Sequence, residues 1–165
     1  NDRSFLNNAS IGIYPELVEL RERETHSVTK TLRMLLAGVQ LLGQARPLPV
    51  DLRYGDKRVR EAAWLVFVGN NSYNLGMLKA GQRTRLDTGC LDVVIVPAQQ
   101  RQLARMAIKR AEPHPRQIIR AQVAAAQAKI LDGDCTIALD GEDMTLKQPL
   151  AFRSVPGALW LVAPA

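Results

Sequence analysis

The sequence predicts an α+β domain, mainly an antiparallel β-sandwich with a few added helices. Three observations carry this prediction. Short apolar stretches alternate with turn residues along most of the chain, early segments repeat leucines at spacings of three and four, and residues 64–68 form an uninterrupted apolar run. The alternation is typical of half-exposed strands, the leucine spacing of amphipathic helices, and the apolar run of a strand covered on both faces.

The bulk composition fits one domain of ordinary size. The chain has 165 residues, of which 47% are hydrophobic and 23% are charged. No apolar stretch reaches the roughly 18 residues that a transmembrane helix needs; the longest, Met34 to Gly43, includes Gln40. The chain's two cysteines, Cys90 and Cys135, are expected to be free buried thiols, which fits a reducing cytoplasm. The chain begins at Asn1 without an initiator methionine, which indicates a piece of something longer.

The first half is expected to begin with a strand, continue as two helices and return to strands. Pro15 suits the first turn of a helix, and Gly43 suits the end of the second one. Apolar residues alternate with polar ones before Gly55, whereas the following run ends fully apolar. The expected elements are a strand over Phe5–Tyr14, helices over Pro15–Glu24 and Ser27–Gly43, and strands over Val50–Tyr54, Val59–Val68 and Leu91–Val96, with a loop at Gly69–Ser72.

The second half is expected to contain one helix followed by short strands. Gln100–Arg110 has apolar residues on one face and basic residues on another, so it is the clearest amphipathic helix. Gln122–Ile130 stays ambiguous between helix and strand because it is rich in alanine. Turn residues separate the remaining segments. The expected strands are Cys135–Leu139, Met144–Leu146, Leu150–Arg153 and Ala158–Val162.

The positive charge is concentrated in one segment. The chain has a formal net charge of +6, and residues 101–120 contain six basic residues against Glu112 alone, a surplus of +5. Arg101, Arg105 and Lys109 lie four residues apart, so they share one helix face. Such a face is either ordinary solvated surface or a patch for an anionic membrane, where each basic residue contributes about 1 kcal/mol.

The tripeptide Asp140-Gly141-Glu142 combines two carboxylates with a glycine at the end of a predicted strand. A glycine at this place tolerates positive φ and a close approach of another group. A carboxylate pair can orient a metal-bound water or accept a proton from a hydroxyl. An ordinary hairpin turn with solvated acids fits the same residues.

The order and spacing of four segments resemble the carboxy-terminal domain of the diacylglycerol kinase family of bacterial lipid kinases, with sphingosine kinases and NAD kinases as more distant relatives. The segments are Phe5–Pro15, Phe67–Asn71, Arg85–Val94, and Leu139–Glu142 followed by Val155–Leu159. The resemblance covers essentially the whole chain. It favours the functional interpretation of the Asp-Gly-Glu turn over the hairpin alone.

The resemblance implies that residues 1–165 are one carboxy-terminal domain and that an amino-terminal nucleotide-binding domain is absent from this chain. It implies an ATP-dependent lipid kinase whose active site lies between the two domains. Glu142 would accept the proton of the lipid hydroxyl, and Asp140 would position it or a magnesium-bound water. Such an enzyme takes part in lipid metabolism and phospholipid biosynthesis, and its acceptor is a diacylglycerol, a phospholipid or a sphingoid base.

The resemblance also implies a magnesium site in the sandwich domain. Its ligands fall on the main-chain carbonyls of Arg85 and Cys90 and on the side chain of Thr88. This sequence departs from the family, which commonly has aspartate where this chain has Thr88. Since Mg²⁺ prefers hard, charged oxygen ligands, a neutral hydroxyl is expected to weaken the site.

The chain lacks a glycine-rich phosphate loop, so we expect no kinase activity from these residues alone. ATP and Mg²⁺ are the expected cofactors of the full-length enzyme. Its expected partners are the lipid, its own amino-terminal domain and the surface of an anionic membrane. An apolar pocket is expected beside the early helices, with Leu32–Leu42 either lining it or packing in the core. Oligomerisation stays open.

Two other functions remain open at this point. A NAD kinase-like enzyme would need a polar dinucleotide site rather than an apolar pocket. A non-enzymatic basic module would bind anionic membrane or nucleic acid. Nucleic acid is the weaker alternative, because aromatic residues make up only 5% of the chain and offer no obvious platform for stacking bases.

Overall fold

The computed structural model describes residues 2–12, 47–74, 83, 85–98 and 118–160. Within these ranges it contains strands, turns and loops. The helices predicted at 15–24, 27–43 and 100–110 lie outside the described residues, as does the stripe 32–42. The predicted antiparallel β architecture is confirmed, whereas the added helices stay a prediction.

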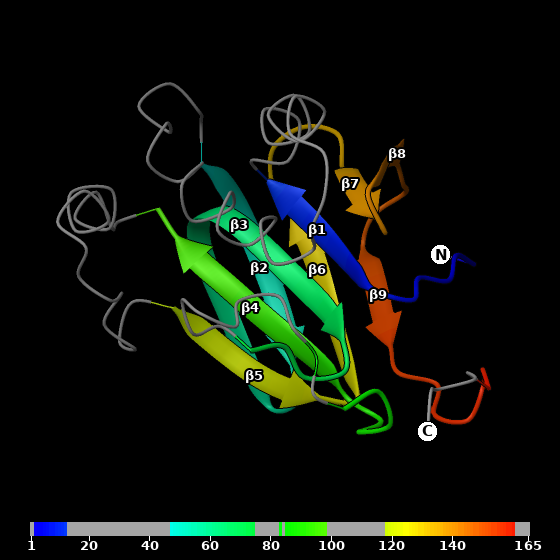
Figure 1. Ribbon diagram of the computed structural model, residues 1–165. Helices are drawn as coiled ribbons and strands as arrows, with labels where there is room; N and C mark the ends of the chain where they lie inside the picture. The colour runs from blue at the N-terminus through cyan, green and yellow to red at the C-terminus, as the bar shows by residue number, and fades with distance from the viewer. Residues whose placement is uncertain (1, 13–46, 75–82, 84, 99–117, 161–165) are drawn as a thin grey trace, which may run out of the picture.

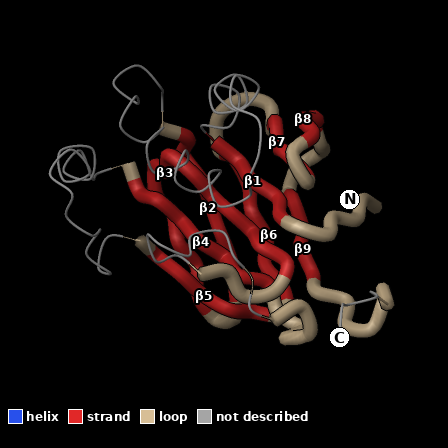
Figure 2. The backbone as a smooth tube through the Cα atoms, in the orientation of Figure 1, coloured by secondary structure: helices blue, strands red, loops and turns tan. Residues whose placement is uncertain are grey.

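Nine strands form the described part of the fold (Figures 1 and 2). They are β1 (Asn8–Gly12), β2 (Leu48–Tyr54), β3 (Lys57–Asn70), β4 (Leu91–Pro97), β5 (Ile119–Val123), β6 (Ala125–Ile130), β7 (Thr136–Leu139), β8 (Glu142–Thr145) and β9 (Leu150–Arg153).

The long strand β3 joins two sets of strands. Its first half pairs with β2, which continues to β6 and β9. Its second half lies between β1 and β4; β1 continues to β7 and β8, and β4 continues to β5. All these pairings are antiparallel. The register with β4 shifts between Ala63 and Leu65, an irregularity that bends a strand and lets it serve both sets.

The two sets of strands share one hydrophobic core. Leu52 and Leu150 come from the β2–β6–β9 set, whereas Ile11, Ile95 and Ile137 come from the other, and each is at most 2% exposed. Strand β4 is buried along its whole length, as its continuous apolar sequence predicts. Figure 1 shows β1 and β4 crossing in front of β2 and β6, an arrangement like a sandwich.

Several predicted boundaries are wrong for local reasons. The first strand begins at Asn8 rather than Phe5, because the amides of residues 6–8 donate to a carboxylate elsewhere. Strand β3 extends to Asn70, through part of the predicted loop 69–72. Residues 158–160 are not a strand: the Ala158 amide donates to the Val155 carbonyl within a turn, so it is unavailable to a sheet.

A charge cluster on β2 and β3 makes one pH-dependent contribution to stability. The Asp51 carboxylate, 10% exposed, accepts hydrogen bonds from Arg58 Nε at 2.8 Å and from Arg60 Nε at 3.0 Å. The hydrogen bonds from Arg58 hold the pKa of Asp51 well below its usual value, against an opposing effect of burial. A lowered pKa stabilises the fold above about pH 4, the unfolded value, and that gain is lost as the pH falls toward the folded value.

We therefore expect Asp51→Asn to melt at a lower temperature than the natural sequence at pH 7. The difference in Tm is expected to shrink progressively below about pH 4, where the unfolded chain begins to take up the proton. Thermal unfolding followed by circular dichroism between pH 2 and 7 measures it. A Tm difference that stays constant across this range would show that the Asp51 charge does not stabilise the fold.

Candidate functional site

The Asp-Gly-Glu segment is the tight turn between β7 and β8. Leu139 pairs with Glu142, so Asp140 and Gly141 form a two-residue hairpin loop. Their φ values are +52° and +100°, and two positive values are what a type I′ turn requires. Aspartate followed by glycine suits that turn, because both tolerate the left-handed region better than most residues. The sequence therefore fixes a rigid turn at this end of the sheet.

The carboxylate of Asp140 binds the main chain of the segment that leads into β1. Its Oδ2 accepts from the Leu6 amide at 2.7 Å, and its Oδ1 accepts from the Asn7 and Asn8 amides at 2.7 and 3.0 Å. The Asp140 amide donates in return to the Asn8 carbonyl at 2.9 Å. Hydrogen bonds to an ionised acceptor are stronger than neutral ones. Asp140 thus ties the turn to residues 6–8, and this geometry suits a positioning role.

Glu142 opens β8 with an exposed side chain. Paired residues of an antiparallel hairpin project to the same face, so Glu142 shares a face with Leu139, as Met144 does with Ile137. Asp143 projects to the opposite face. Within the described part of the chain, the Glu142 carboxylate has no hydrogen bond or ion pair. Among the described residues, nothing therefore occupies the Glu142 carboxylate.

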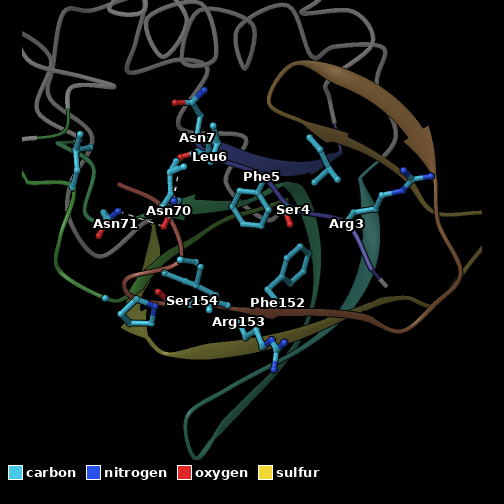
Figure 3. Close-up of a pocket in the computed structure, with 18 of the residues that line it drawn as sticks. Arg3, Ser4, Phe5, Leu6, Asn7, Asn70, Asn71, Phe152, Arg153 and Ser154 are labelled. Atoms are coloured by element: carbon cyan, nitrogen blue, oxygen red, sulfur yellow. Dashed lines mark hydrogen bonds between the residues drawn. The ribbon is translucent and has the colours of Figure 1, made fainter. Parts of the chain in front are cut away.

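A cavity of about 1040 Å³ adjoins this face of the β7–β8 hairpin. It is roughly at the upper end of the size range of small-molecule sites. Ile137 and Leu139, on the face that Glu142 shares, belong to its walls. In Figure 3 the rings of Phe5 and Phe152 lie side by side within it, and their centroids are 6.4 Å apart. Further apolar lining comes from Leu91, Leu146, Leu150 and Val155. The site is therefore a hollow with mixed apolar and polar walls; Glu142 is not among the residues that line it, but shares a hairpin face with two that do.

The polar edge of the cavity is held by Arg83, which the sequence did not single out. Its guanidinium donates to the Leu6 carbonyl at 3.0 Å and to Asn7 Oδ1 at 2.7 Å. It also lies 5.5 Å from the centre of the Tyr73 ring, whose hydroxyl donates to the Asn7 carbonyl at 2.9 Å. Burial raises the pKa of Tyr73, so its hydroxyl stays protonated as a donor. Arg83 thus binds the segment of residues 6–8 through the Leu6 carbonyl and the Asn7 side chain, whereas Asp140 binds its main-chain amides.

Strands β4 and β5 carry an ion pair next to Tyr73, with Asp92 on β4 and Arg120 on β5. Asp92 is fully buried, and its Oδ1 accepts from Arg120 Nε at 2.7 Å. Its Oδ2 accepts from the other side of the Arg120 fork and from the Tyr73 amide. Arg120 also donates to the Tyr73 carbonyl. The pair fixes the turn that carries Tyr73.

Replacing Arg120 with leucine is expected to destabilise the fold by about 3–5 kcal/mol, because it leaves the Asp92 carboxylate buried without its cation. Arg53→Leu is the matched control, since Arg53 is exposed on β2. Urea unfolding of both variants measures the difference. Equal unfolding free energies for the two variants would show that the buried pair does not hold this region together.

The predicted magnesium ligands lie in the loop before β4, and the donors there suit a divalent cation poorly. The Thr88 hydroxyl donates to Asn71 Oδ1 at 2.8 Å, and the Cys90 carbonyl accepts from the Asn71 amide at 2.9 Å. The one carboxylate of the loop, Asp87, pairs with the Arg85 guanidinium at 3.0 and 3.2 Å. Thr88 and Cys90 thus offer neutral oxygens, and the one carboxylate of the loop is paired with a guanidinium, where Mg²⁺ prefers charged ligands.

No cluster of three His, Cys, Asp or Glu side chains able to hold a metal is found among the residues that the structure describes. A search of the same residues finds no helix with the length and apolar character needed to cross a bilayer. The basic residues Arg101, Arg105 and Lys109 lie outside the described ranges, so the proposed membrane patch stays a prediction.

Comparison with known proteins gives one family and one set of related structures. Residues 10–163 match the model of the YegS C-terminal NAD kinase beta sandwich-like domain. Two solved structures of provisionally assigned diacylglycerol kinases from Bacillus anthracis str. Sterne superpose with TM-scores of 0.65 and 0.64, at 19% and 23% sequence identity. Each match covers 93% of this chain but only 51% and 50% of the other. The chain therefore spans about half the length of these structures.

Proposed function

From the premise that this chain belongs to the YegS C-terminal, NAD kinase beta sandwich-like domain family, we propose that it forms the acceptor side of an ATP-dependent lipid kinase. The intact enzyme transfers the γ-phosphoryl group of ATP to a lipid hydroxyl. Residues 1–165 supply the general base and the lipid-facing surface as one domain. A separate amino-terminal domain supplies the nucleotide site, and ATP and Mg²⁺ are bound there.

One observation carries this proposal: the Glu142 carboxylate, which has no partner among the described residues, shares a hairpin face with Ile137 and Leu139, two apolar residues in the walls of a large cavity. An alcohol group at the end of a lipid can reach that carboxylate while its chains occupy the apolar hollow. NAD would instead need a polar surface for its pyrophosphate and riboses. Ten of the 26 lining residues are leucine, isoleucine or phenylalanine, and this apolar part of the lining supports the lipid.

The proposed chemistry needs one proton acceptor from this domain. The hydroxyl oxygen of the lipid attacks the γ-phosphorus, the bond to the β–γ bridging oxygen breaks, and ADP leaves. The hydroxyl proton passes to the Glu142 carboxylate. Phosphoryl transfer asks little else of the protein beyond alignment and charge neutralisation. Asp140 contributes by holding the turn, since its oxygens are occupied by the amides of residues 6–8.

Exposed apolar side chains around the cavity support contact with a lipid surface. Leu6, Leu86, Val155 and Leu159 line the cavity and are each 50–56% exposed. A soluble surface seldom gathers such side chains unless they bind something. The basic face at Arg101, Arg105 and Lys109 is proposed to add electrostatic attraction to anionic lipid. We thus propose a cytoplasmic enzyme that binds membranes peripherally.

A panel of acceptors tests the proposal on the intact protein. Radiolabelled ATP is supplied with diacylglycerol, phosphatidylglycerol, sphingosine or NAD, and the products are separated by thin-layer chromatography. We expect label in one or more lipids and none in NAD, and no transfer by residues 1–165 alone. Transfer to NAD but to no lipid would establish the NAD kinase-like alternative, and transfer to neither would favour a non-enzymatic binding module.

A further inference from the structure

The loop before β4 is held by a single buried side chain at the end of β3. Asn71 is 6% exposed and has a φ of +65°, a left-handed conformation that asparagine tolerates better than most residues. Its Oδ1 accepts from the Thr88 amide at 2.9 Å and from the Thr88 hydroxyl at 2.8 Å. The main-chain amide of Asn71 donates to the Cys90 carbonyl at 2.9 Å. Three hydrogen bonds therefore join Asn71 to residues 88–90.

A divalent cation in this loop would draw on the Thr88 hydroxyl and the Cys90 carbonyl. Both are neutral oxygens, and both are hydrogen-bonded to Asn71. The hydroxyl also lies 3.1 Å from Cys90 Sγ, a soft neighbour that suits Mg²⁺ poorly. The Asp87 carboxylate, the one charged oxygen group of residues 85–90, is paired with the Arg85 guanidinium. Apart from this paired carboxylate, the oxygens of residues 85–90 are neutral, whereas Mg²⁺ prefers charged ones.

We propose that Asn71 and Thr88 form a metal-independent clasp that orders this loop in place of a bound divalent cation. The amide oxygen of Asn71 acts as the shared acceptor at the centre of the loop, and the Thr88 donors converge on it as ligands would converge on a metal. Asparagine also supplies the left-handed backbone that the clasp requires. The loop keeps its conformation whether or not Mg²⁺ is present.

Cation binding by the chain gives the first test, and it needs neither nucleotide nor lipid. We expect isothermal titration with MgCl₂ to give no saturable heat, and the Tm to agree within about 1 °C in about 10 mM Mg²⁺ and in EDTA. A site with a Kd of about 0.1 mM would raise the Tm by several degrees under these conditions. Saturable binding together with faster exchange of the Thr88 amide in EDTA would overturn the proposal. Because no catalysis is measured, failure here leaves the proposed kinase function untouched.

Hydrogen exchange at the Thr88 amide gives the second test, because this group donates to the clasp. Asn71→Gly removes the acceptor but keeps a residue that adopts positive φ, and we expect exchange at Thr88 to accelerate at least about tenfold. Thr88→Val removes only the hydroxyl bond and is expected to lower the Tm, whereas Thr88→Ser keeps that bond and should restore it. Unchanged exchange in Asn71→Gly, at equal Mg²⁺, would contradict the clasp.

Discussion

Lipid phosphorylation by the intact protein is expected to fall about 10²–10⁴-fold when Glu142 is replaced by glutamine, the range typical for loss of a general base. Glutamine has nearly the same shape but does not accept the hydroxyl proton. The Tm should stay unchanged, because Glu142 is exposed and has no partner among the described residues. Steady-state kinetics with saturating lipid measure kcat, and thermal unfolding measures the Tm.

Asp143→Asn is the matched control for Glu142→Gln. Both residues are exposed acids on β8, but alternation along the strand directs Asp143 to the face away from Leu139. Its replacement removes the same charge and should leave kcat within about threefold of the natural sequence. Equal losses in the two variants would mean that general charge in this hairpin, rather than a base at position 142, supports the reaction.

Replacing Asp140 is expected to lower both stability and activity. Asp140→Gly removes the acceptor for three main-chain amides while keeping a residue that tolerates the φ of +52°. Hydrogen bonds to charged groups contribute about 1.5–3 kcal/mol each, less where water reaches them, so we expect the Tm to fall by about 4–8 °C. The kcat should fall as well, because the turn that carries Glu142 loses its attachment to residues 6–8.

Asp140→Asn distinguishes the contributions of the two carboxylate oxygens, because it replaces one of them with an amide nitrogen. Its amide oxygen can still accept from Asn7 and Asn8, while its amide nitrogen would face the Leu6 donor. We therefore expect a Tm between those of Asp140→Gly and the natural sequence. Differential scanning calorimetry of the three proteins checks this order. A Tm for Asp140→Gly equal to that of the natural sequence would refute the structural part of the account.

Strands with continuous apolar sequence were predicted well, and alanine-rich ones were not. The predicted strands 59–68 and 91–96 lie within β3 and β4, and their apolar runs 64–68 and 91–96 fall on the mostly buried parts of these strands, because burial on both faces requires apolar residues. The sequence of Gln122–Ile130 did not distinguish helix from strand, yet this segment contains the end of β5 and all of β6. Alanine favours helices by its intrinsic propensity, so the pairing with β2 and β9 overrides that preference here.

The sequence located the turn of the candidate site but not the residues that hold it. Asp140 and Glu142 lie two positions apart in one hairpin, so the local pattern of two acids around a glycine identifies them. Arg83 and Tyr73 act on Asn7 across 76 and 66 positions, and nothing in their neighbouring sequence indicates those contacts. Asparagine pairs at 7–8 and 70–71 were part of the family resemblance, and they were the one available signal.

The central claim is that a lipid hydroxyl lies against Glu142 while the rest of the lipid fills the adjoining cavity. Photo-crosslinking of the intact protein with a diacylglycerol that carries a diazirine beside its hydroxyl tests this most directly. We expect mass spectrometry to find label in residues 137–146 and 2–7, and excess unlabelled diacylglycerol to remove it. Label confined to peptides outside the cavity, unaffected by that competitor, would contradict the claim.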